Sequence, residues 1–412
     1  MKIIADVKIK EAFVNLSAWS GEQMNSPQVS IIIPCYNAER YVGDAIESAL
    51  SQKCTVQVIV VDDGSTDRSA EVVERYAPAV QLVRTSNHGI ACARNVAIDL
   101  LKAPYALLLD NDDRLNQDAL CQLLSAMQGS QQRVVYGRFQ GWNHDMTRRL
   151  AIPRLASLKP HPFEFLSCQD FTPPGAVLFP TSAFDKVGKL DQAVAGCDDW
   201  DFLMRLARAG LTFHGINKVV FHYRRLASSA SNRPRHMLDA GLEVIRRAHH
   251  PDVRVHDDNF PTGLPIESLA QKQFLWGADC FALAAVRGIS AEIDDVFANI
   301  PVPPNPCWET FTVTVRKMLV WHCQPYRDGT TDPFRDGLIQ SARYLKQRLS
   351  AFDPHSQACK SLIYPDFTQL IKRPGPRKAV RLWSEWRAAK SILAAIGDDP
   401  DDAPMSTPES AS

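Results

Sequence analysis

The first half of the chain alternates between short apolar runs and stretches whose apolar residues recur at helical spacing. The apolar runs are rich in Val, Ile and Leu and cover residues 29–34, 56–61, 81–84 and 105–109. The stretches with helical spacing cover residues 41–52, the segment around Val72, Val73 and Tyr76, and residues 90–101. Runs of the first kind are typical of buried strands. Because strands and helices alternate, the pattern predicts an α/β fold with a mainly parallel central sheet flanked by helices.

The pattern changes after about residue 233. Before that point, apolar runs at residues 133–136 and 176–179 extend the predicted sheet, and residues 199–209 predict a helix that ends at Gly210. After it, helical spacing recurs over residues 236–248, 266–287 and 336–350. We therefore expect five segments. They are a leader over residues 1–27, an α/β domain over 28–233, a mainly α-helical C-terminal domain over 234–370, a basic amphipathic helix over 371–397, and a disordered acidic tail over 398–412.

Charge and cysteine content narrow the classes of function. Lys and Arg total 46, as do Asp and Glu, so the net charge predicts no general attraction to nucleic acid or anionic membranes. The 10 cysteines form no CxxC pair, which argues against a zinc site or a disulfide framework. No stretch approaches the roughly 18 consecutive apolar residues of a membrane-spanning helix. Lys2 and Asp6 interrupt the N-terminus too early for a secretory signal. The sequence thus predicts a cytoplasmic protein.

Residues 376–396 combine one apolar stripe with many basic residues. The stripe consists of Leu382, Trp386, Ala389, Leu393 and Ile396, which fall at helical spacing. Around it, Glu385 is the one acid among Lys372, Arg373, Arg377, Lys378, Arg381, Arg387 and Lys390. A helix of this kind suits peripheral contact with anionic lipid at the inner face of the membrane. The alternative is a helix docked on the protein's own core with a solvated basic face.

Polar residues gather just beyond the ends of the predicted strands. Pro34, Tyr36 and Asn37 follow the first strand, Asp62 and Asp63 the second, Asn87, Gly89, Arg94 and Asn95 the third, and Asp110, Asp112 and Asp113 the fourth. Because parallel strands all end on the same side of a sheet, we expect these loops to converge on one crevice.

The chemistry of these loops predicts a nucleotide ligand. The three carboxylates within residues 110–113 repel one another and suit a hard cation, Mn²⁺ or Mg²⁺, bridged to substrate phosphates. A carboxylate deep in such a crevice can accept the imide N–H of uracil or thymine. Neither a P-loop nor a GxGxxG pattern is present, so the phosphates need the metal. The alternatives are a solvated acidic turn for residues 110–113 and a capped turn at Asp62.

The order and spacing of the strand-end motifs also carry a resemblance. The motifs are Ile33-Pro34-Cys35-Tyr36-Asn37, Val61-Asp62-Asp63-Gly64-Ser65-Thr66-Asp67, Asn87-x-Gly89-x-x-x-Ala93-Arg94-Asn95 and Leu109-Asp110-Asn111-Asp112-Asp113. As an ordered set over roughly residues 28–230, they resemble the family 2 glycosyltransferases of the GT-A fold, whose α/β domain is Rossmann-like. That family continues with a Gly-Gly-Phe-Asp-like turn and a Glu-Asp pair. This chain has Lys189 at the second Gly and Asp198 in place of Glu, a change that keeps the charge.

The resemblance implies a role for each matching residue. Asp199 would be the general base, and Pro34 and Asp62 would contact the nucleoside. Asp110 and Asp112 would hold the sugar-nucleotide and the divalent metal, Mn²⁺ or Mg²⁺, with Asp113 as an alternative ligand. The further substrate contacts would be Tyr36, Asn37, Asp63, Asn87, Gly89, Arg94, Asn95 and Asp198.

Three assignments have structural alternatives. Asp198 and Asp199 would serve the substrate and the reaction, or they would form an acidic first turn stabilised by the helix dipole. His222 would complete the metal shell, or it would pack beside a strand. Arg94 would contact phosphate, or it would pair with one of the acidic loops.

The resemblance implies an inverting, metal-dependent glycosyltransferase. The expected donor is a nucleotide-diphosphate sugar, UDP-sugar above others, and the expected acceptor is a hydroxyl of a saccharide, lipid-linked or cell-surface molecule. One alternative is a catalytically silent sugar- or nucleotide-binding scaffold of the same fold. Another is a sugar-nucleotide pyrophosphorylase, whose Gly-rich N-terminal loop is absent around residues 34–37.

Overall fold

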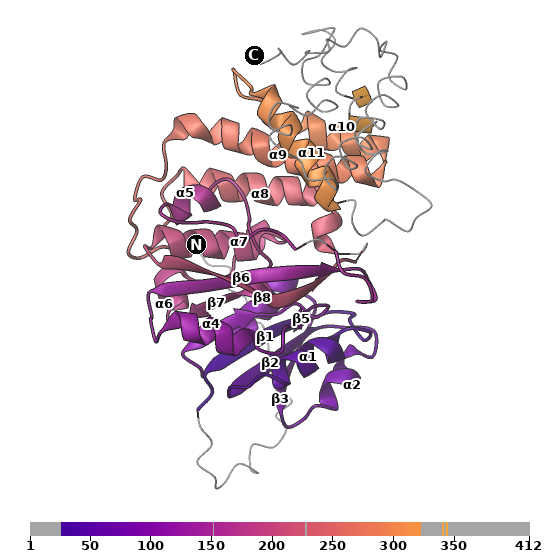
Figure 1. Ribbon diagram of the computed structural model, residues 1–412, viewed down its shortest axis with the longest axis vertical. Helices are drawn as coiled ribbons and strands as arrows, with labels where there is room; N and C mark the ends of the chain where they lie inside the picture. Colours follow the sequence, from indigo (N-terminus) through magenta and orange to yellow (C-terminus); the bar gives the residue numbers. More distant parts are fainter. Residues whose placement is uncertain (1–25, 151, 227–228, 323–339, 342, 345–412) are drawn as a thin grey trace, which may run out of the picture.

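The computed structural model describes residues 26–150, 152–226, 229–322, 340–341 and 343–344 (Figure 1). Most of the predicted leader, the predicted basic helix over residues 371–397 and the predicted tail over residues 398–412 lie outside these residues. Most of the helix predicted over residues 336–350 lies outside them as well.

One eight-stranded sheet organises the first part of the chain, in the order β3-β2-β1-β4-β7-β6-β8-β5. Its strands are β1 (Val29–Cys35), β2 (Val56–Asp63), β3 (Val80–Thr85), β4 (Tyr105–Leu108), β5 (Arg114–Leu115), β6 (Arg133–Trp142), β7 (Val177–Pro180) and β8 (Thr212–Arg224). The strands β1 to β4 pair in parallel, as the alternation of strands and helices predicts. In the other half, β7 runs antiparallel to β4 and β6, while β6 and β8 are parallel, so the whole sheet is mixed.

The helices fall into two groups. Those within the α/β part are α1 (Val42–Leu50), α2 (Ser69–Glu74), α3 (Ile90–Ile98), α4 (Ala119–Met127), α5 (Pro162–Leu166), α6 (Ala183–Val187) and α7 (Asp198–Arg208). Those of the later helical region are α8 (Pro234–Ala248), α9 (Leu269–Arg287), α10 (Ser290–Ala298) and α11 (Trp308–His322). The predicted α/β class followed by a helical region is therefore confirmed, whereas the exact domain boundaries stay predictions.

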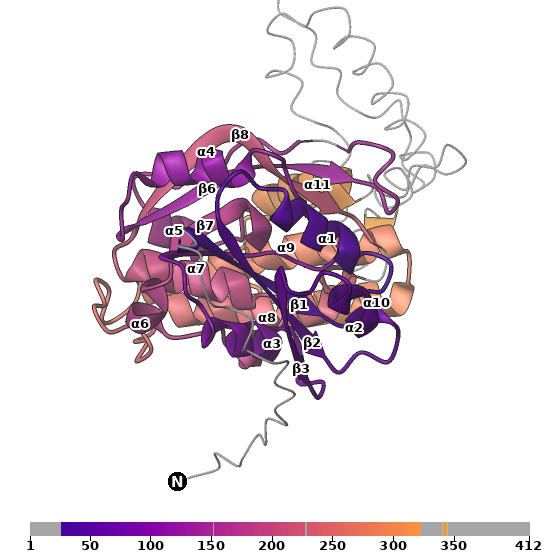
Figure 2. The ribbon, with the colours of Figure 1, turned by 90° about the horizontal axis from the view of Figure 1, so that it is seen from below.

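Both faces of the parallel strands are buried, which explains their uninterrupted apolar runs. Successive side chains of a strand point to opposite faces, so Ile31 and Ile33 join one core with α1 and α4, while Ile32 joins another with α3 and α7. Figure 2 shows α3 on one side of β1, β2 and β3, and α1 and α2 on the other. The predicted site therefore lies at the strand ends of a sheet that is packed on both faces.

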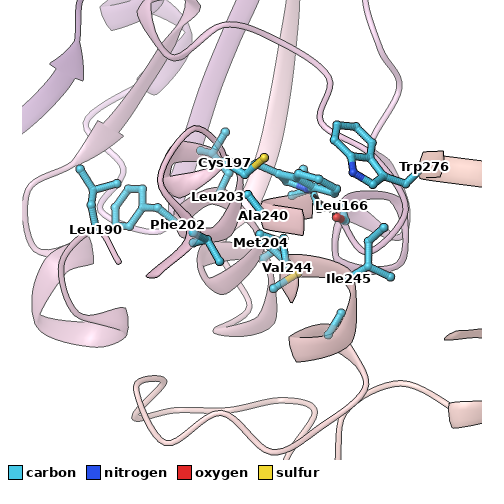
Figure 3. Close-up of a cluster of buried hydrophobic side chains, with 14 of the residues drawn as sticks. Leu166, Leu190, Cys197, Phe202, Leu203, Met204, Ala240, Val244, Ile245 and Trp276 are labelled. Atoms are coloured by element: carbon cyan, nitrogen blue, oxygen red, sulfur yellow. Dashed lines mark hydrogen bonds between the residues drawn. The ribbon is translucent and has the colours of Figure 1, made fainter. Parts of the chain in front are cut away.

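The helix α7 lies between the sheet and the helical region (Figure 1). Trp200 is fully buried, donates its indole N–H to the carbonyl of Leu166 at 2.7 Å, and lies 4.9 Å from the Trp276 ring of α9 between ring centroids. Figure 3 shows Leu203 and Met204 of this helix beside Ala240 and Val244 of α8, with Phe202 toward Leu190. The helical region therefore shares one apolar core with the α/β part.

Two buried arginines of α7 tie this helix to loops on either side. Arg205 pairs with Asp201 at 2.9 Å and donates to the carbonyls of Val187 and Lys189. Arg208 pairs with Asp258 and donates to the carbonyl of Arg247 in the last turn of α8 and to those of His250 and Phe260 in the segment that follows it. A buried charge needs such partners, so the position of α7 is fixed by polar contacts as well as by apolar packing.

Some elements were not predicted from the sequence. The strand β8 carries polar residues such as His214, Asn217 and Lys218, because its middle is partly exposed and its register with β6 is interrupted by a bulge. The helices α10 and α11 lie on either side of the Pro-rich joint at residues 300–304, and α11 buries Phe311, Val315 and Leu319 at helical spacing. Among the described residues, no helix is both long enough and apolar enough to span a membrane.

We predict that Gly241→Ala destabilises the protein by weakening the contact between α8 and α9. A Cβ at this position would lie 2.2 Å from Nε1 of Trp276, whose ring is held by the Trp200 contact and by its hydrogen bond to Met237. Overpacking of this kind costs about 1–3 kcal/mol, which urea denaturation measures. Gly43→Ala in α1 is the matched control: its Cβ would meet only the end of the Tyr76 side chain, at 3.1 Å, and Val72. A Gly241→Ala variant as stable as the control would contradict the packing described here.

Candidate active site

Side-chain hydrogen bonds join the loops that follow the parallel strands. Asn37, after β1, accepts the backbone N–H of Thr66, after β2, at 2.8 Å. Its left-handed backbone, with φ of 48°, is one that asparagine tolerates. Asn111, after β4, donates its side-chain amide to the carbonyl of Pro34 at 2.8 Å. These bonds bring the loops after β1, β2 and β4 together, as their position at parallel strand ends predicts.

The neighbouring carboxylates Asp62 and Asp63 at the end of β2 differ in their hydrogen-bond partners. Asp63 is buried, and its two oxygens accept the backbone N–H groups of His88 at 2.9 Å and Gly89 at 2.8 Å. It therefore shapes the loop after β3, and the substrate contact predicted for it would have to displace these bonds. Asp62 is fully buried, but its Oδ2 has no hydrogen-bond partner among the described residues and lies 3.4 Å from Nε of Arg84. Asp62 thus has acceptor capacity that the protein leaves unused.

The loop after β4 places Asp110 and Asp112 close together. Asp110 accepts Nη2 of Arg94 at 2.6 Å and keeps 26 % of its side chain exposed. Burial, followed by the negative charge of Asp110, raises the pKa of Asp112 to about 7. A divalent cation would relieve this repulsion. Magnesium and manganese are commonly held by one or two carboxylates together with substrate phosphates, so these two residues fit such a metal.

The other two predicted metal ligands have different surroundings. Asp113 is fully buried, and its Oδ1 accepts the backbone N–H of Arg224 at 2.6 Å. Nδ1 of His222 accepts the indole N–H of Trp142 at 3.0 Å, and burial together with the charges of Arg114 and Arg149 lowers the pKa of His222. Within the described ranges, no group of three or more His, Cys, Asp or Glu side chains is arranged to hold a metal. His222 packs against Trp142, and the metal-binding role of these four residues stays a prediction.

Asp199 lies in the first turn of α7, where the sequence predicts an acidic pair. Its side chain is half-buried and borders an apolar recess whose other walls are Leu108, Pro174, Val177, Phe179, Phe202 and Leu203. This burial, followed by the charges of Asp170 and Asp198, raises the pKa of Asp199 well above its usual value, although Arg94 opposes the shift. A helix N-terminus favours the charged form of a carboxylate, but here burial dominates. The result is a carboxylate with the proton affinity of a useful base.

Three residues of the predicted substrate site have protein partners instead. Asp198 is buried and pairs with Nη1 of Arg94 at 2.7 Å. Asn95 exchanges two hydrogen bonds with the backbone of Leu190, at 2.8 and 3.0 Å. Arg94 pairs with the acidic loops, which was the structural alternative to a phosphate contact. These three residues hold the site together from beneath, and none of them presents a free polar group to a ligand.

The remaining predicted contacts stay open to solvent. Tyr36 is 47 % exposed, and Asn87 and Gly89 are exposed as well. They lie on the loops after β1 and β3, on the side where Asp62 and Asp110 lie. Their roles toward a substrate remain predictions.

Sequence reasoning missed two residues that shape the site. Arg224, at the end of β8, donates to the carbonyls of Asp112 and His144 and pairs with Asp44 of α1 at 2.8 Å. Asp170 lies on an irregular segment far from every motif, and among the negative charges it contributes most to the raised pKa of Asp199. No periodicity or motif marks either residue, because β8 was not predicted and isolated acids in loops are common.

Comparison with known proteins points to one family. The sequence pattern of the family described as Glycosyl transferase family 2 matches residues 30–182. An uncharacterised glycosyltransferase of Haemophilus influenzae is 35 % identical over 121 residues, which are 28 % of this chain and 48 % of that protein. Chondroitin synthase of Escherichia coli is 43 % identical over 98 residues, which are 23 % of this chain and 14 % of that protein. The chain thus spans less than half the length of these curated relatives.

Two further proteins match parts of the chain. The poly(ribitol-phosphate) beta-glucosyltransferase of Bacillus spizizenii is 33 % identical over 124 residues, covering 28 % of this chain and 20 % of that protein. Among solved structures, residues 1–349 of TarS from S. aureus align with a TM-score of 0.48 at 17 % identity, over 78 % of this chain and 92 % of that one. The family pattern covers the strand-end motifs that carry Asp62, Asp110 and Asp112. Residues 30–182 are thus similar to glycosyl transferase family 2.

Proposed function

We propose that the protein is an inverting glycosyltransferase. In this proposal it transfers a sugar from a UDP-sugar to a hydroxyl of a saccharide, lipid-linked or cell-surface acceptor. The observation that carries the proposal is the ion-pair network Asp110–Arg94–Asp198, with distances of 2.6 and 2.7 Å. It joins the donor motif after β4 to the start of α7, where Asp199 follows Asp198. A donor-binding carboxylate and a base of raised pKa are thus held in one site.

Asp199 supplies the base. Its carboxylate accepts the proton of the acceptor hydroxyl while the hydroxyl oxygen bonds to the anomeric carbon of the donor and the bond to the diphosphate breaks. UDP leaves with the bonding electrons. Because the base and the leaving group stand on opposite sides of the sugar, direct displacement inverts the anomeric configuration. The apolar recess beside Asp199 excludes water from one side of the carboxylate.

Asp62 recognises the nucleobase of the donor. Its buried Oδ2, without a hydrogen-bond partner in the described chain, can accept the N3–H of uracil. A buried acceptor left unpaired costs free energy, so a ligand that donates to it gains what the free protein lacks. Cytosine has no proton on N3, which supports UDP over CDP.

Asp112, next to Asp110, would hold the divalent metal, Mn²⁺ or Mg²⁺. When bound, such a cation neutralises negative charge on a departing diphosphate. Asp113 and Arg224 hold the backbone of this loop in place for that purpose.

The relatives support an acceptor of the polysaccharide kind. Two of them are named chondroitin synthase and hyaluronan synthase, and another is named for glucosylation of poly(ribitol-phosphate). The membrane contact through residues 376–396, at the inner face, belongs to the same proposal and concerns residues that the structure does not describe.

A nucleotide-binding panel tests the donor half of the proposal. Thermal unfolding would be measured with UDP-, GDP-, dTDP- and CDP-sugars, each with and without Mn²⁺, on the wild type and on Asp112→Asn. A ligand at 100 times its Kd stabilises a protein by about 2.7 kcal/mol, so we expect a clear rise in Tm with UDP-sugar and Mn²⁺ alone. Asp112→Asn should lose the metal-dependent part of the rise. Stabilisation by no nucleotide would favour a catalytically silent scaffold instead.

Asp199→Asn tests the part of the proposal that concerns catalysis. The substitution keeps the shape of the side chain but removes its proton affinity, so UDP release from the donor should fall by about 10²–10⁴-fold. Binding of the UDP-sugar, measured by calorimetry in the same variant, should be retained. Turnover at the wild-type rate would exclude Asp199 as the base.

Asp170→Asn should move the pH dependence of turnover in a defined direction. Asp199 acts as a base in its ionised form, so activity rises with pH through its raised pKa. The Asp170 charge contributes to that rise, and its removal lowers the pKa of Asp199. The acidic limb of the kcat profile should therefore shift to lower pH.

Glu267→Gln is the control for the loss of one negative charge. Glu267 is exposed in the short turn before α9, and Asp199 lies outside its contacts. The pH profile of kcat for Glu267→Gln should match that of the wild type. An acidic limb that stays in place, or moves to higher pH, in Asp170→Asn would contradict the assignment.

A further inference from the structure

The guanidinium of Arg94 lies between the two halves of the proposed site. Nη2 contacts Oδ1 of Asp110 at 2.6 Å, and Nη1 contacts Oδ2 of Asp198 at 2.7 Å. The side chain is 3 % exposed, and its Nε has no hydrogen-bond partner among the described residues. Both terminal nitrogens are thus occupied by carboxylates, which leaves little of the guanidinium for a phosphate.

The helix α3, which carries Arg94, is fixed to the segment that leads into α7. Asn95 exchanges two hydrogen bonds with the backbone of Leu190, and Asp99 pairs with Lys189 at 2.5 Å. On its other side, α3 packs on the sheet through small residues such as Ala93 and Ala97. Arg94 therefore projects from a support that cannot move independently of either the sheet or the α7 segment.

Asp198 has no exposed oxygen with which to bind a substrate. The residue is 1 % exposed, its Oδ2 holds Arg94, and its Oδ1 accepts the backbone N–H of Gly196 at 3.3 Å. Gly196 has a left-handed backbone, with φ of 90°. Asp198 thus fixes the turn that begins α7, and Asp199 is the next residue of that turn.

We propose that Arg94 is a positioning residue that couples the donor site to the catalytic base. Its two ion pairs hold Asp110 at the donor side and Asp198 at the start of α7, so a displacement of either carboxylate is transmitted to the other. The planar guanidinium bridges two carboxylates in a fixed geometry, which the single ammonium of lysine does not reproduce. This inference rests on the proposed function, because it assigns Asp110 to the donor and Asp199 to the reaction.

The test is whether a change on the base side alters donor binding. The Kd for UDP in the presence of Mn²⁺ would be measured by calorimetry for wild type, Asp198→Asn, Arg94→Lys and the double variant. Asp198 is buried on the base side of Arg94, so coupling through Arg94 predicts weaker UDP binding in Asp198→Asn, by about 5-fold or more. Arg94→Lys should weaken binding similarly, and the double variant should be no weaker than Arg94→Lys alone.

Turnover provides the second readout. Arg94→Lys should also lower kcat by about 10-fold or more, because small displacements of reacting groups cost large factors in rate. Arg208→Lys is the matched control, since Arg208 is equally buried and paired, at 2.8 Å with Asp258, but contacts neither Asp110 nor Asp198. It should lower Tm without changing the Kd for UDP.

The outcomes separate this inference from the proposed function. UDP binding that is equal in wild type and Asp198→Asn would overturn the coupling while leaving the donor site intact. Additive losses in the double variant would also overturn it, because each residue would then act alone. Absence of UDP binding in the folded wild type would instead overturn the proposed function. If Asp198→Asn does not fold, the comparison of Arg94→Lys with Arg208→Lys still decides, through the Kd for UDP.

Discussion

The site depends on one constraint, which is that a buried charge must have a partner. Burying an unpaired ion is too costly for a folded protein to tolerate. In this protein the partners of the buried charges come from distant parts of the chain. Arg94 joins residues 16 and 104 positions away, and Arg224 contacts residues 111 and 180 positions away. Each such pair fixes one loop against another, so the polar interior positions the elements that apolar packing alone would leave free to slide.

The same constraint divides the acidic residues of the site into two groups. Asp63 and Asp198 are buried, and backbone N–H groups or an arginine occupy both of their oxygens, so they shape loops. Asp113 shares features of both groups, because its Oδ1 accepts the backbone N–H of Arg224 while its Oδ2 has no hydrogen-bond partner among the described residues and burial raises its pKa. Oδ2 of Asp62 also lacks a hydrogen-bond partner there, although Nε of Arg84 lies 3.4 Å away, and the pKa values of Asp112 and Asp199 are raised. An N–H donor, a cation or a hydroxyl proton of a ligand would suit Asp62, Asp112 and Asp199, respectively.

Much of this arrangement could be predicted from the sequence, and the missing part has a physical reason. Local apolar runs predicted β1 to β4 correctly, and the strand-end motifs predicted which loops meet. The strand β8 was missed because most of its residues are exposed or only partly buried, so its pattern resembles a loop. Asp170 and Arg224 were missed because their importance arises only from the tertiary fold, which brings them beside Asp199 and Asp112.

A motif fixes the spacing of backbone positions, but not the direction in which each side chain points. Asp62 and Asp63 are adjacent in a strand, so their side chains leave on opposite faces. The Asp63 side chain faces the loop after β3, where two backbone N–H groups donate to its carboxylate. The Asp62 side chain leaves on the other face, and its Oδ2 has no hydrogen-bond partner among the described residues. Likewise, Asp198 and Asp199 are successive residues of a helix, about 100° apart around its axis. The first turns toward Arg94 and the second toward the apolar recess. Neighbouring acids in one motif are therefore a pair with unequal tasks, in which the carboxylate that binds protein groups fixes the backbone of the one that retains acceptor capacity or a raised pKa.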